Sequence, residues 1–264
     1  MLQVLYSNQK VGRLWSKEHE LCLQYDAEWL NSANAFPLTP HLALQTAPWY
    51  GDPVLFFFSN LLPEGTVLDT ILKLRRLPRG NLYAQLAEFG EDAAGAFSIV
   101  PEGDVQQRQP AYQAYPVETI RADIARLRNH IPLLFQHGEL RLSLAGAQDK
   151  IPVHYSNEVF HLPVGGAAST HILKPPIQPE QLFPEAVLNE AFCLKLAKHC
   201  GLDTVTADIV YLPEPILLVE RYDRLHANGQ IRRLHQLDFC QLAGLLPSQK
   251  YTRMAVPISP YCFS

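Results

Sequence analysis

Short runs of apolar residues, separated by polar turn residues, fill the first hundred positions of the chain. The polar turn Ser7-Asn8-Gln9-Lys10 separates two such runs and is typical of the loop of a β-hairpin. Further on, apolar residues recur every three or four positions, which predicts helices. We expect strands over Gln3–Tyr6, Val11–Trp15 and Ala96–Val100 and helices over Val67–Arg76 and Leu82–Phe89. Residues 1–103 are therefore predicted to form a small β-rich N-terminal module.

The pattern changes after residue 103. Residues 104–116 hold four glutamines, two prolines and little apolar content, a composition typical of a linker. Longer strands follow, and the helix predicted over Pro184–Cys200 has Gly201 as its stop signal. We also predict strands over Leu140–Leu144, Ile151–Tyr155, Val159–Leu162, His171–Leu173, Thr206–Tyr211 and Ile216–Arg221 and helices over Val117–Arg128 and Gln236–Leu245. The second part is thus predicted to be an antiparallel sheet with helices, and the whole fold to be α+β.

Composition and charge narrow the classes of protein. With 264 residues, 47% hydrophobic and 18% charged, the chain is typical of a folded globular protein rather than a disordered one. A net charge of −4 argues against nucleic acid as a direct partner, because phosphate-backbone binders carry a basic excess. The five cysteines are odd in number and lack metal-ligand spacing, so we expect reduced thiols and no metal site. They are Cys22, Cys193, Cys200, Cys240 and Cys262.

Targeting signals are not apparent in the sequence. The first residues, MLQVLYSNQK, lack the positive segment and the apolar core of a secretory signal. The most apolar short stretch, Val54–Phe58, is far below the roughly 20 residues that span a bilayer. We therefore expect a cytoplasmic protein without a membrane partner.

Three features occur in an order that favours a nucleotide site. A loop of small residues, Ser143-Leu-Ala-Gly-Ala-Gln-Asp-Lys150, lies between two predicted strands, Lys174 ends a third strand, and Glu190 lies in the next helix. Backbone N–H groups of such a loop can approach phosphates, while a strand lysine held by a helix carboxylate supplies positive charge at the α- and β-phosphates. The apolar strand Leu217–Tyr222 follows, where a kinase has the hinge that contacts adenine.

Each feature also has a simpler interpretation. A loop with one glycine is more often an ordinary hairpin, and a lysine at a strand end is more often a solvated charge. Glu190 could equally be an exposed helix residue, and Ser143 a strand serine bonded to its neighbours. It is the order of the features, together with the hinge strand, that favours a nucleotide site.

Several blocks resemble the HipA toxin kinases, a family of serine/threonine protein kinases in type II toxin–antitoxin systems. The resemblance in the second part rests on Arg141–Lys150, on Thr170-His-Ile-Leu-Lys-Pro175 and on Val219-Glu-Arg-Tyr-Asp-Arg224. Ser59-Asn-Leu-Leu-Pro-Glu-Gly65 and Glu88-Phe-Gly-Glu-Asp-Ala-Ala-Gly95 resemble the N-terminal module of that family. The resemblance implies the HipA N-terminal subdomain over 1–103, the linker over 104–116, and a protein-kinase-like N-lobe with hinge over 117–251. On the same resemblance we expect residues 252–264 to be a divergent tail and the kinase C-lobe to be absent.

The resemblance also implies roles for single residues. Ser143 would be the autophosphorylated serine, whose modification ejects the loop and switches the kinase off. The residues that would bind ATP are Ala145, Gly146, Ala147, Gln148, Lys174, Glu220, Tyr222 and Gln236. Glu190 is assigned as the partner of Lys174 from general kinase logic rather than from a motif. ATP is the implied cofactor, with Mg²⁺ whose ligands in the family are mostly missing here.

The groups that carry out phosphoryl transfer are not found in the sequence. Kinases of this type need an Asp-x-x-x-x-Asn catalytic loop and a later metal-binding Asp, and we expect the sequence to stop before both. Two segments have the spacing, Asp26–Asn31 and Asp223–Asn228. The first lies in the N-terminal module and the second directly follows the hinge, where an Asn-Gly turn is expected. We therefore assign no catalytic residue and no metal ligand.

Two functions remain open. The first is the ATP-binding portion of a HipA-type kinase toxin, whose family precedent for a substrate is glutamyl-tRNA synthetase. The second is a non-catalytic module that pairs with a separate C-lobe fragment, a dimer mate or a HipB-like DNA-binding antitoxin. Because a missing C-lobe would expose Phe239, Leu242 and Leu245, we expect a partner to cover these residues.

Overall fold

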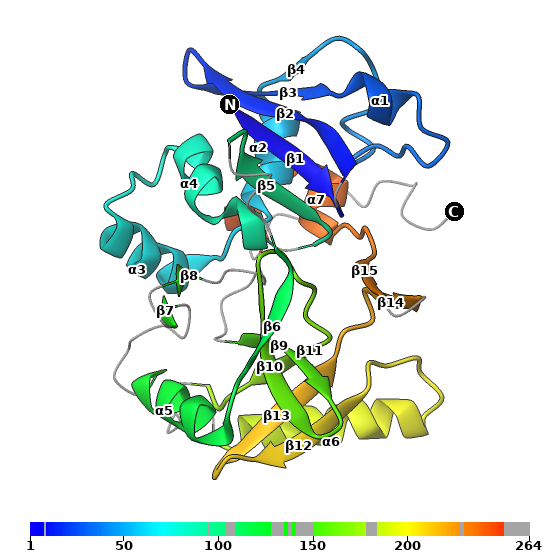
Figure 1. The fold of residues 1–264 in the computed structure, drawn as a ribbon. Coiled ribbons are helices and arrows are strands. Elements are labelled where there is room, and N and C mark those ends of the chain that lie inside the picture. The colour runs from blue at the N-terminus through cyan, green and yellow to red at the C-terminus, as the bar shows by residue number, and fades with distance from the viewer. Residues whose placement is uncertain are drawn as a thin grey trace.

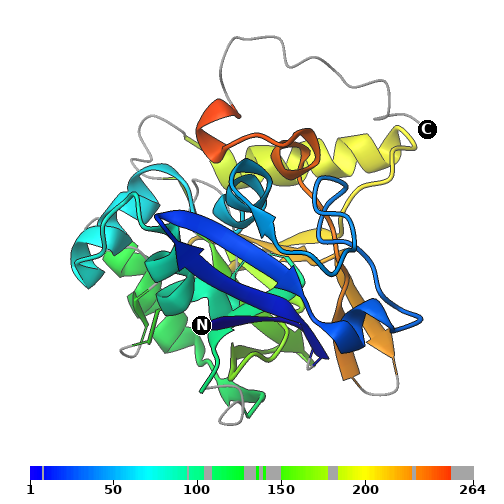
Figure 2. The same cartoon turned by 90° about the horizontal axis from the view of Figure 1, so that it is seen from above.

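The structure is a computed structural model in which two antiparallel sheets, each with its own helices, follow one another along the chain. The α+β class predicted from the sequence is confirmed. Figure 1 shows the first sheet in the upper part of the molecule and the second sheet below it, and Figure 2 gives the view from above. The structure describes residues 1–7, 9–93, 95–103, 109–127, 135–136, 139–140, 150–177, 184–227 and 230–250.

The first sheet has five strands in the order β4-β3-β2-β1-β5. Its strands are β1 (Leu2–Tyr6), β2 (Gln9–Lys17), β3 (Glu20–Tyr25), β4 (Trp49–Tyr50) and β5 (Phe97–Pro101). Its helices are α1 (Ala27–Leu30), α2 (Asp52–Ser59), α3 (Gly65–Arg75), α4 (Leu82–Phe89) and the 3₁₀ turn η1 (Gly90–Asp92). β1 pairs with both β2 and β5, so the two ends of the N-terminal module lie side by side at one edge of the sheet.

Helix α2 was not predicted from the sequence. Its apolar stretch, Val54–Phe58, lacks the polar positions that would give a helical period, because this helix is covered on more than one side. The helix begins after Gly51, whose φ of 69° few other residues adopt, and Pro53 lies in its first turn.

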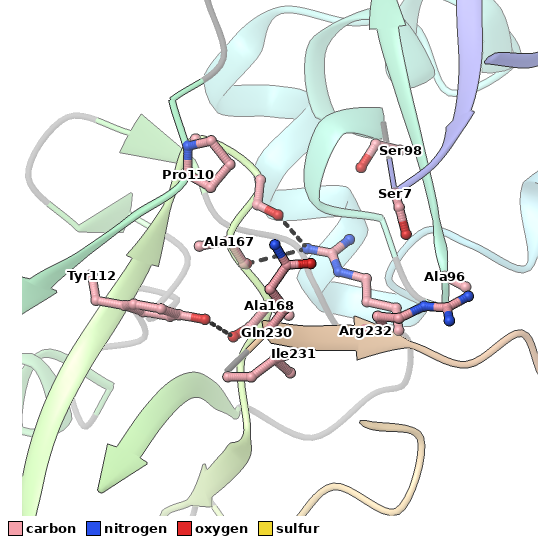
Figure 3. A pocket seen from close by; sticks show the side chains of 13 residues that line it. Ser7, Ala96, Ser98, Pro110, Tyr112, Ala167, Ala168, Gln230, Ile231 and Arg232 are labelled. Carbon is pink, nitrogen blue, oxygen red and sulfur yellow. Dashed lines mark hydrogen bonds between the residues drawn. The ribbon is translucent and has the colours of Figure 1, made fainter. Parts of the chain in front are cut away.

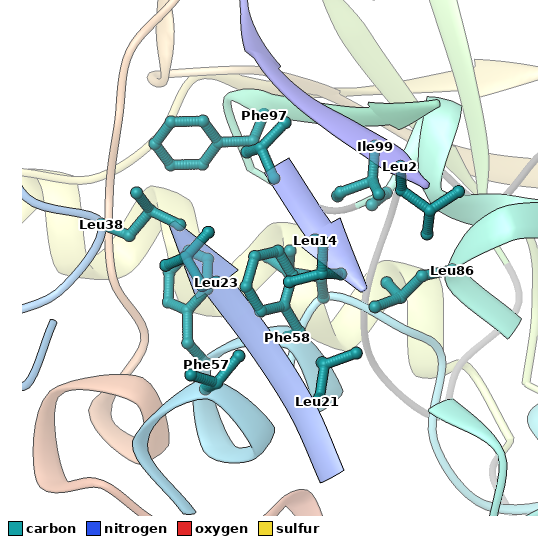
Figure 4. Packing of buried hydrophobic residues seen from close by; sticks show 14 of the residues in the cluster. Leu2, Leu14, Leu21, Leu23, Leu38, Phe57, Phe58, Leu86, Phe97 and Ile99 are labelled. Atoms are coloured by element: carbon teal, nitrogen blue, oxygen red, sulfur yellow. The ribbon is translucent and has the colours of Figure 1, made fainter. Parts of the chain in front are cut away.

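A single core joins this sheet to its helices. Alternate residues of the strands point inward, and they meet Phe57 and Phe58 of α2, Leu86 of α4 and Phe97 of β5, all of which are buried. Figure 4 shows these aromatic and aliphatic side chains packed together around the strands. At about 25 cal/mol per Å² of apolar surface removed from water, burial of this kind is the main stabilising term of the N-terminal module.

The second sheet has six strands in the order β12-β13-β11-β9-β10-β6. Its strands are β6 (Ala111–Ala114), β9 (Ile151–Ser156), β10 (Val159–Val164), β11 (His171–Lys174), β12 (Ala207–Tyr211) and β13 (Pro215–Glu220). Two hairpins complete the strands, β7 (Phe135–Gln136) with β8 (Glu139–Leu140) and β14 (Arg224–Ala227) with β15 (Gln230–Arg233). The remaining helices are α5 (Val117–Leu127), α6 (Ala186–His199), α7 (Phe239–Ala243) and the 3₁₀ turn η4 (Pro247–Gln249).

The predicted linker over 104–116 contains an edge strand in its second half. β6 pairs antiparallel with β10, and the side chain of Tyr115, directly after it, is buried and donates a hydrogen bond to Asp123 at 2.8 Å. The pattern did not predict this strand because all four residues of β6 are exposed, so the strand needs little apolar content. Residues 104–108 of the predicted linker lie outside the described residues.

Helix α6 ends close to the predicted position, followed by Gly201 at a φ of 84°. It packs against β12 and β13 through Val187 and Ala191, which meet Leu217 of β13. In the described ranges, no helix has both the length and the apolar character to cross a membrane. Four cysteines are free thiols, and Cys262 lies outside the described residues.

Helix α7 is shorter than the helix predicted over Gln236–Leu245. Asp238 caps it, accepting a hydrogen bond from the backbone of Gln241, whose side chain accepts one in return from the backbone N–H of Asp238. Gly244, at a φ of 67°, ends the helix. Although α7 comes late in the chain, it lies against α2 of the N-terminal module, as Figure 1 shows.

Candidate nucleotide site and family membership

Lys174 and Glu190 form an ion pair at the end of β11, an interior strand of the second sheet. Lys174 is the last residue of β11, whose pairing with β13 places it opposite Leu217. Glu190 lies in the second turn of α6, which packs on the outer strands of the same sheet and so faces its carboxylate toward the end of β11. The side chains of Lys174 and Glu190 are 20% and 38% exposed, so the pair is partly open to solvent and can reach a ligand.

Two further lysines and a glutamate surround this pair. Lys150 precedes β9, and burial lowers the pKa of its ammonium group, with the positive charges of Lys174 and Lys250 acting in the same direction. Glu64 and Glu190 offset this in part. Lys250 is itself paired with Glu64 at 3.1 Å. Three ammonium groups thus share two carboxylates, an arrangement that a polyphosphate would stabilise.

The small-residue loop before Lys150 lies outside the described residues. This applies to Ser143, Ala145, Gly146, Ala147 and Gln148, so the roles expected for them stay predictions. Sequence reasoning did not single out Lys150, Glu64 or Lys250 as site residues, although the first two belong to the blocks that carry the family resemblance. Their proximity depends on contacts between distant parts of the chain.

The expected hinge residues follow one another with alternating exposure. Glu220 ends β13 opposite His171, and its backbone N–H donates to the carbonyl of Thr206 at 2.9 Å. Its side chain and that of Tyr222, which is 71% exposed, are open to solvent. Arg221 between them is buried, with its N–H bonded to the carbonyl of Thr170.

Asp223 is held in a buried network of arginines rather than in an open site. Arg221 donates two hydrogen bonds to its carboxylate, at 2.9 and 2.7 Å, and Arg224 donates a third at 2.9 Å. Burial by itself raises the pKa of Asp223, but the hydrogen bonds and charges of the two arginines outweigh it and lower the pKa. Gln236, expected at the nucleotide, donates to Asp223 at 3.4 Å, and its side-chain oxygen is buried with no hydrogen-bond partner among the described residues.

Neither segment with the Asp-x-x-x-x-Asn spacing forms an open catalytic loop among the described residues. Asp26 caps α1 through the N–H of Glu28 and forms an ion pair with Lys10 at 3.0 Å. Asp223 belongs to the arginine network, and the hairpin β14–β15 follows it, as the Asn-Gly turn predicted. Within the described ranges, His, Cys, Asp and Glu side chains do not gather in groups of three or more that could hold a metal ion.

The segment after β15 is bound to the N-terminal module by contacts that span most of the chain. His235 bonds to the carbonyl of Leu38 at 2.9 Å and stacks on Phe36. Asn60 donates to the carbonyl of Leu245 at 2.8 Å, which explains why the block Ser59–Gly65 lies next to the end of the described chain. Further contacts join Tyr6 to Arg233, Thr39 to Gln241, His41 to Leu242 and Gln241 to Phe57.

This packing covers part of the apolar set Phe239, Leu242 and Leu245, which were expected to be exposed without a partner. Leu242 and Leu245 are half-buried, because the N-terminal module lies over them. Phe239, the first residue of α7, is 82% exposed, and Phe192 of α6 is 63% exposed. The expected apolar exposure is therefore present at Phe239 and reduced at the two leucines.

Comparison with known proteins identifies related chains. The chain is 36% identical to a protein described as "Putative kinase Y4mE" from Sinorhizobium fredii. The match covers 100% of this chain and 64% of that protein. At 33% identity 88% of the chain matches 52% of the "Serine/threonine-protein kinase toxin HipA" of Shewanella oneidensis. The chain thus spans about half to two thirds of the length of these relatives.

A solved structure is also similar. The HipA chain in the complex of Shewanella oneidensis HipA with HipB and operator DNA superposes with a TM-score of 0.76 at 29% identity, covering 96% of this chain and 58% of that one. Two family models match, "HipA N-terminal domain" over residues 2–100 and "HipA-like C-terminal domain" over 142–260. The second match includes residues 252–260, which belong to the predicted divergent tail. With both models matched in order, the chain belongs to the HipA family.

Proposed function

We propose that the chain is the ATP-binding part of a HipA-type serine/threonine protein kinase of a toxin–antitoxin system. The observation that carries this proposal is the Lys174–Glu190 ion pair with Lys150 beside it. A strand lysine held by a helix glutamate is the arrangement with which protein kinases fix the α- and β-phosphates of ATP.

The position of the hinge residues supports the same assignment. β11 and β13 are neighbours, and Glu220 lies three residues along β13 from the position opposite Lys174. At about 3.3 Å per residue, this separates the two by roughly 10 Å along the strand, a span suited to a nucleotide with its base at one end and its phosphates at the other. In this proposal Glu220 and Tyr222 bind the adenine, Lys174 and Lys150 the phosphates, and 117–251 is a kinase-like N-lobe.

The loop residues 145–148 and Ser143 complete the proposed site. Their backbone would bind the β- and γ-phosphates, and Ser143 would be the residue whose phosphorylation switches the protein off. ATP supplies the transferable phosphoryl group when bound. Because the described residues offer no cluster of carboxylates for Mg²⁺, we derive no step from a metal and propose that transfer needs groups other than those described here.

A titration of ATP into the purified chain tests this function. For wild type we expect saturable binding, measured by calorimetry or as a thermal shift. Lys174→Met should weaken it at least about tenfold, because a charge-assisted contact to phosphate is lost. Lys195→Met is the matched control, since Lys195 is an exposed lysine on α6, the helix that carries Glu190, and is not part of the ion pair. Equal affinities for the two variants, or no binding by wild type, would contradict the proposal.

A second candidate function is a non-catalytic module that pairs with a HipB-like antitoxin or with a separate catalytic fragment. The exposed Phe239 and Phe192 favour it, since large apolar side chains open to solvent often mark an interface. The similar Shewanella protein was solved with HipB and operator DNA. Phe239→Ser should abolish pairing with such a partner in gel filtration while ATP binding persists; pairing that survives both this change and Phe192→Ser would exclude these surfaces.

A further inference from the structure

A cavity of about 350 Å³ lies at the junction of the two sheets. Its lining does not include Lys150, Lys174 or Lys250, which are called the lysine cluster below. Figure 3 shows Tyr112 on one side of it, Ser7 and Ser98 on the other, and Gln230 and Ile231 between them. Its size falls in the lower range of pockets that hold small molecules. The residues around it are Ser7, Ala96, Ser98, Pro110, Tyr112, Gly165, Gly166, Ala167, Ala168, Gln230, Ile231, Arg232 and Arg233.

The charged residues among these are both arginines. Arg233 is buried, and its guanidinium group donates to the carbonyls of Gly166 at 3.4 Å and Ala167 at 3.3 Å, which fixes it in the wall. Arg232 is exposed at the rim. The described residues that line the cavity include no carboxylate, while Ser7 and Ser98 contribute hydroxyl groups. The lining is thus rich in hydrogen-bond donors and positive in charge.

A second layer of positive charge lies behind this wall. Arg224 donates to the carbonyl of Ser169 at 2.7 Å, one residue after the lining residue Ala168, and Arg221 donates to the hydroxyl of Ser169 at 3.1 Å. Both guanidinium groups share the carboxylate of Asp223. In a medium of low dielectric constant, charges at this depth act on the cavity with little screening.

The wall nearest these arginines is built mainly from backbone. Gly165 and Gly166 have φ values of 58° and 81°, and a Cβ at Gly165 would lie 2.3 Å from the carbonyl oxygen of Gln109. Tyr112 donates to the carbonyl of Ala168 at 2.9 Å and so holds the same loop from the other side. Burial raises the pKa of Tyr112, while the positive charges of Arg233 and Arg224 act to lower it.

We propose that this cavity binds a small organic anion, one that carries a phosphate or carboxylate group. The arginine wall supplies charge-assisted donors to its oxygens, and the volume accommodates a molecule of a few carbons beside them. Because Ser7 and Ser98 belong to the N-terminal module and Arg232 and Arg233 to the second half of the chain, the bound anion links the two halves. The anion therefore stabilises their arrangement independently of ATP.

Calorimetric titration of the full 264-residue chain with glycerol 3-phosphate and with citrate tests this, with neutral glycerol as the reference. At least one anion should bind with a dissociation constant of about 1 mM or tighter, and glycerol should not bind. The two anions distinguish a phosphate from a carboxylate as the preferred group. Arg232→Gln should weaken binding roughly tenfold, because it removes an ionised donor from an exposed position that the fold does not need.

The controls separate this site from the lysine cluster. Arg121→Gln removes the same charge from an exposed position on α5 and should change the affinity by less than about twofold. Lys174→Met should leave anion binding intact even where it abolishes ATP binding. The proposal is overturned if neither anion binds saturably, or if Lys174→Met removes the binding and Arg232→Gln does not.

Discussion

The two halves of the molecule bury different kinds of side chain. The N-terminal module has one continuous core of aliphatic and aromatic residues, with Phe57, Phe58 and Phe97 at its centre. The second half divides its apolar residues between two smaller clusters and buries Arg221, Asp223, Arg224 and Arg233. Buried charges contribute little net stability but require fixed geometry. The first half therefore acts as the stabilising platform, and the second carries the groups that can bind ligands.

The boundary between the halves does not follow the order of the sequence. Residues 235–250 come after the second sheet, yet His235, Leu242, Leu245 and Lys250 bond to Leu38, His41, Asn60 and Glu64 of the N-terminal module. Through Glu64 and Lys250 this packing also reaches Lys150 of the proposed ATP site. The N-terminal module is thus part of the surroundings of the site.

Removing a core aromatic should have the largest effect on stability. Phe58 is fully buried against Phe57, with ring centroids 5.1 Å apart, so Phe58→Ala should lower the free energy of unfolding by about 4 kcal/mol. Phe192→Ala, at an exposed position on α6, should cost less than about 0.5 kcal/mol. Urea denaturation measures both, and similar losses would mean that the first core is not the platform described.

Neutralising the buried carboxylate should come next. Asp223→Asn leaves two buried guanidinium groups without their counter-ion and should cost about 3 kcal/mol in urea denaturation. Asp208→Asn on β12, where the side chain is exposed, should be within about 0.5 kcal/mol of wild type. If the two substitutions proved equally mild, the charge network would not hold the second half together.

Lowering the pH should remove the stabilising contribution of the Asp223–arginine network in the wild-type protein. Because the pKa of Asp223 is lower in the folded protein than its ordinary value of 3.8, its contribution is fully present above that value. The contribution disappears as the pH falls through the folded pKa. The difference in unfolding free energy between wild type and Asp223→Asn should accordingly be constant near neutral pH and shrink below pH 3.8. A difference that grew on acidification would have the wrong sign for this assignment.

Loosening the contact between the halves should have the smallest effect. Asn60 is buried and donates to the carbonyls of Phe56 and Leu245, both at 2.8 Å. Asn60→Ala should cost about 1–2 kcal/mol and increase hydrogen exchange in residues 239–246. Asn34→Ala, at an exposed loop position, is the control. Unchanged exchange in α7 would show that this segment is held by other contacts.

The spacing of apolar residues predicted many helices and strands, because these elements depend mainly on neighbouring residues in the sequence. Alternation and helical spacing placed α4 correctly and β1, β2, α3 and α6 within a few residues of their observed bounds. Helix α2 was missed because a helix buried on several sides has no polar face, and β6 because an edge strand has little apolar content. These two omissions have tertiary causes that periodicity does not contain. Strand β3 was also not predicted.

The candidate site shows the same division. The pairing of Lys174 with Glu190 was expected from kinase logic and is present in the structure. The approach of Glu64 and Lys250 to Lys150 could not be predicted, since Glu64 and Lys250 are 186 positions apart. The arginine network around Asp223 joins close neighbours in the sequence, but its burial against Ser169 depends on tertiary packing that the local pattern does not contain. The loop from Ser143 to Gln148 lies outside the described residues and stays a prediction.

Native mass spectrometry of the purified chain with ATP and Mg²⁺ tests the central claim most directly, because one spectrum reports both bound nucleotide and covalent phosphate. The account predicts an ATP adduct on wild type and on Lys195→Met, a much weaker one on Lys174→Met, and no phosphorylated chain. An ATP adduct of equal abundance on Lys174→Met and on wild type would contradict the proposed nucleotide site. A phosphoryl group on Ser143 would contradict the claim that these residues lack the groups for transfer.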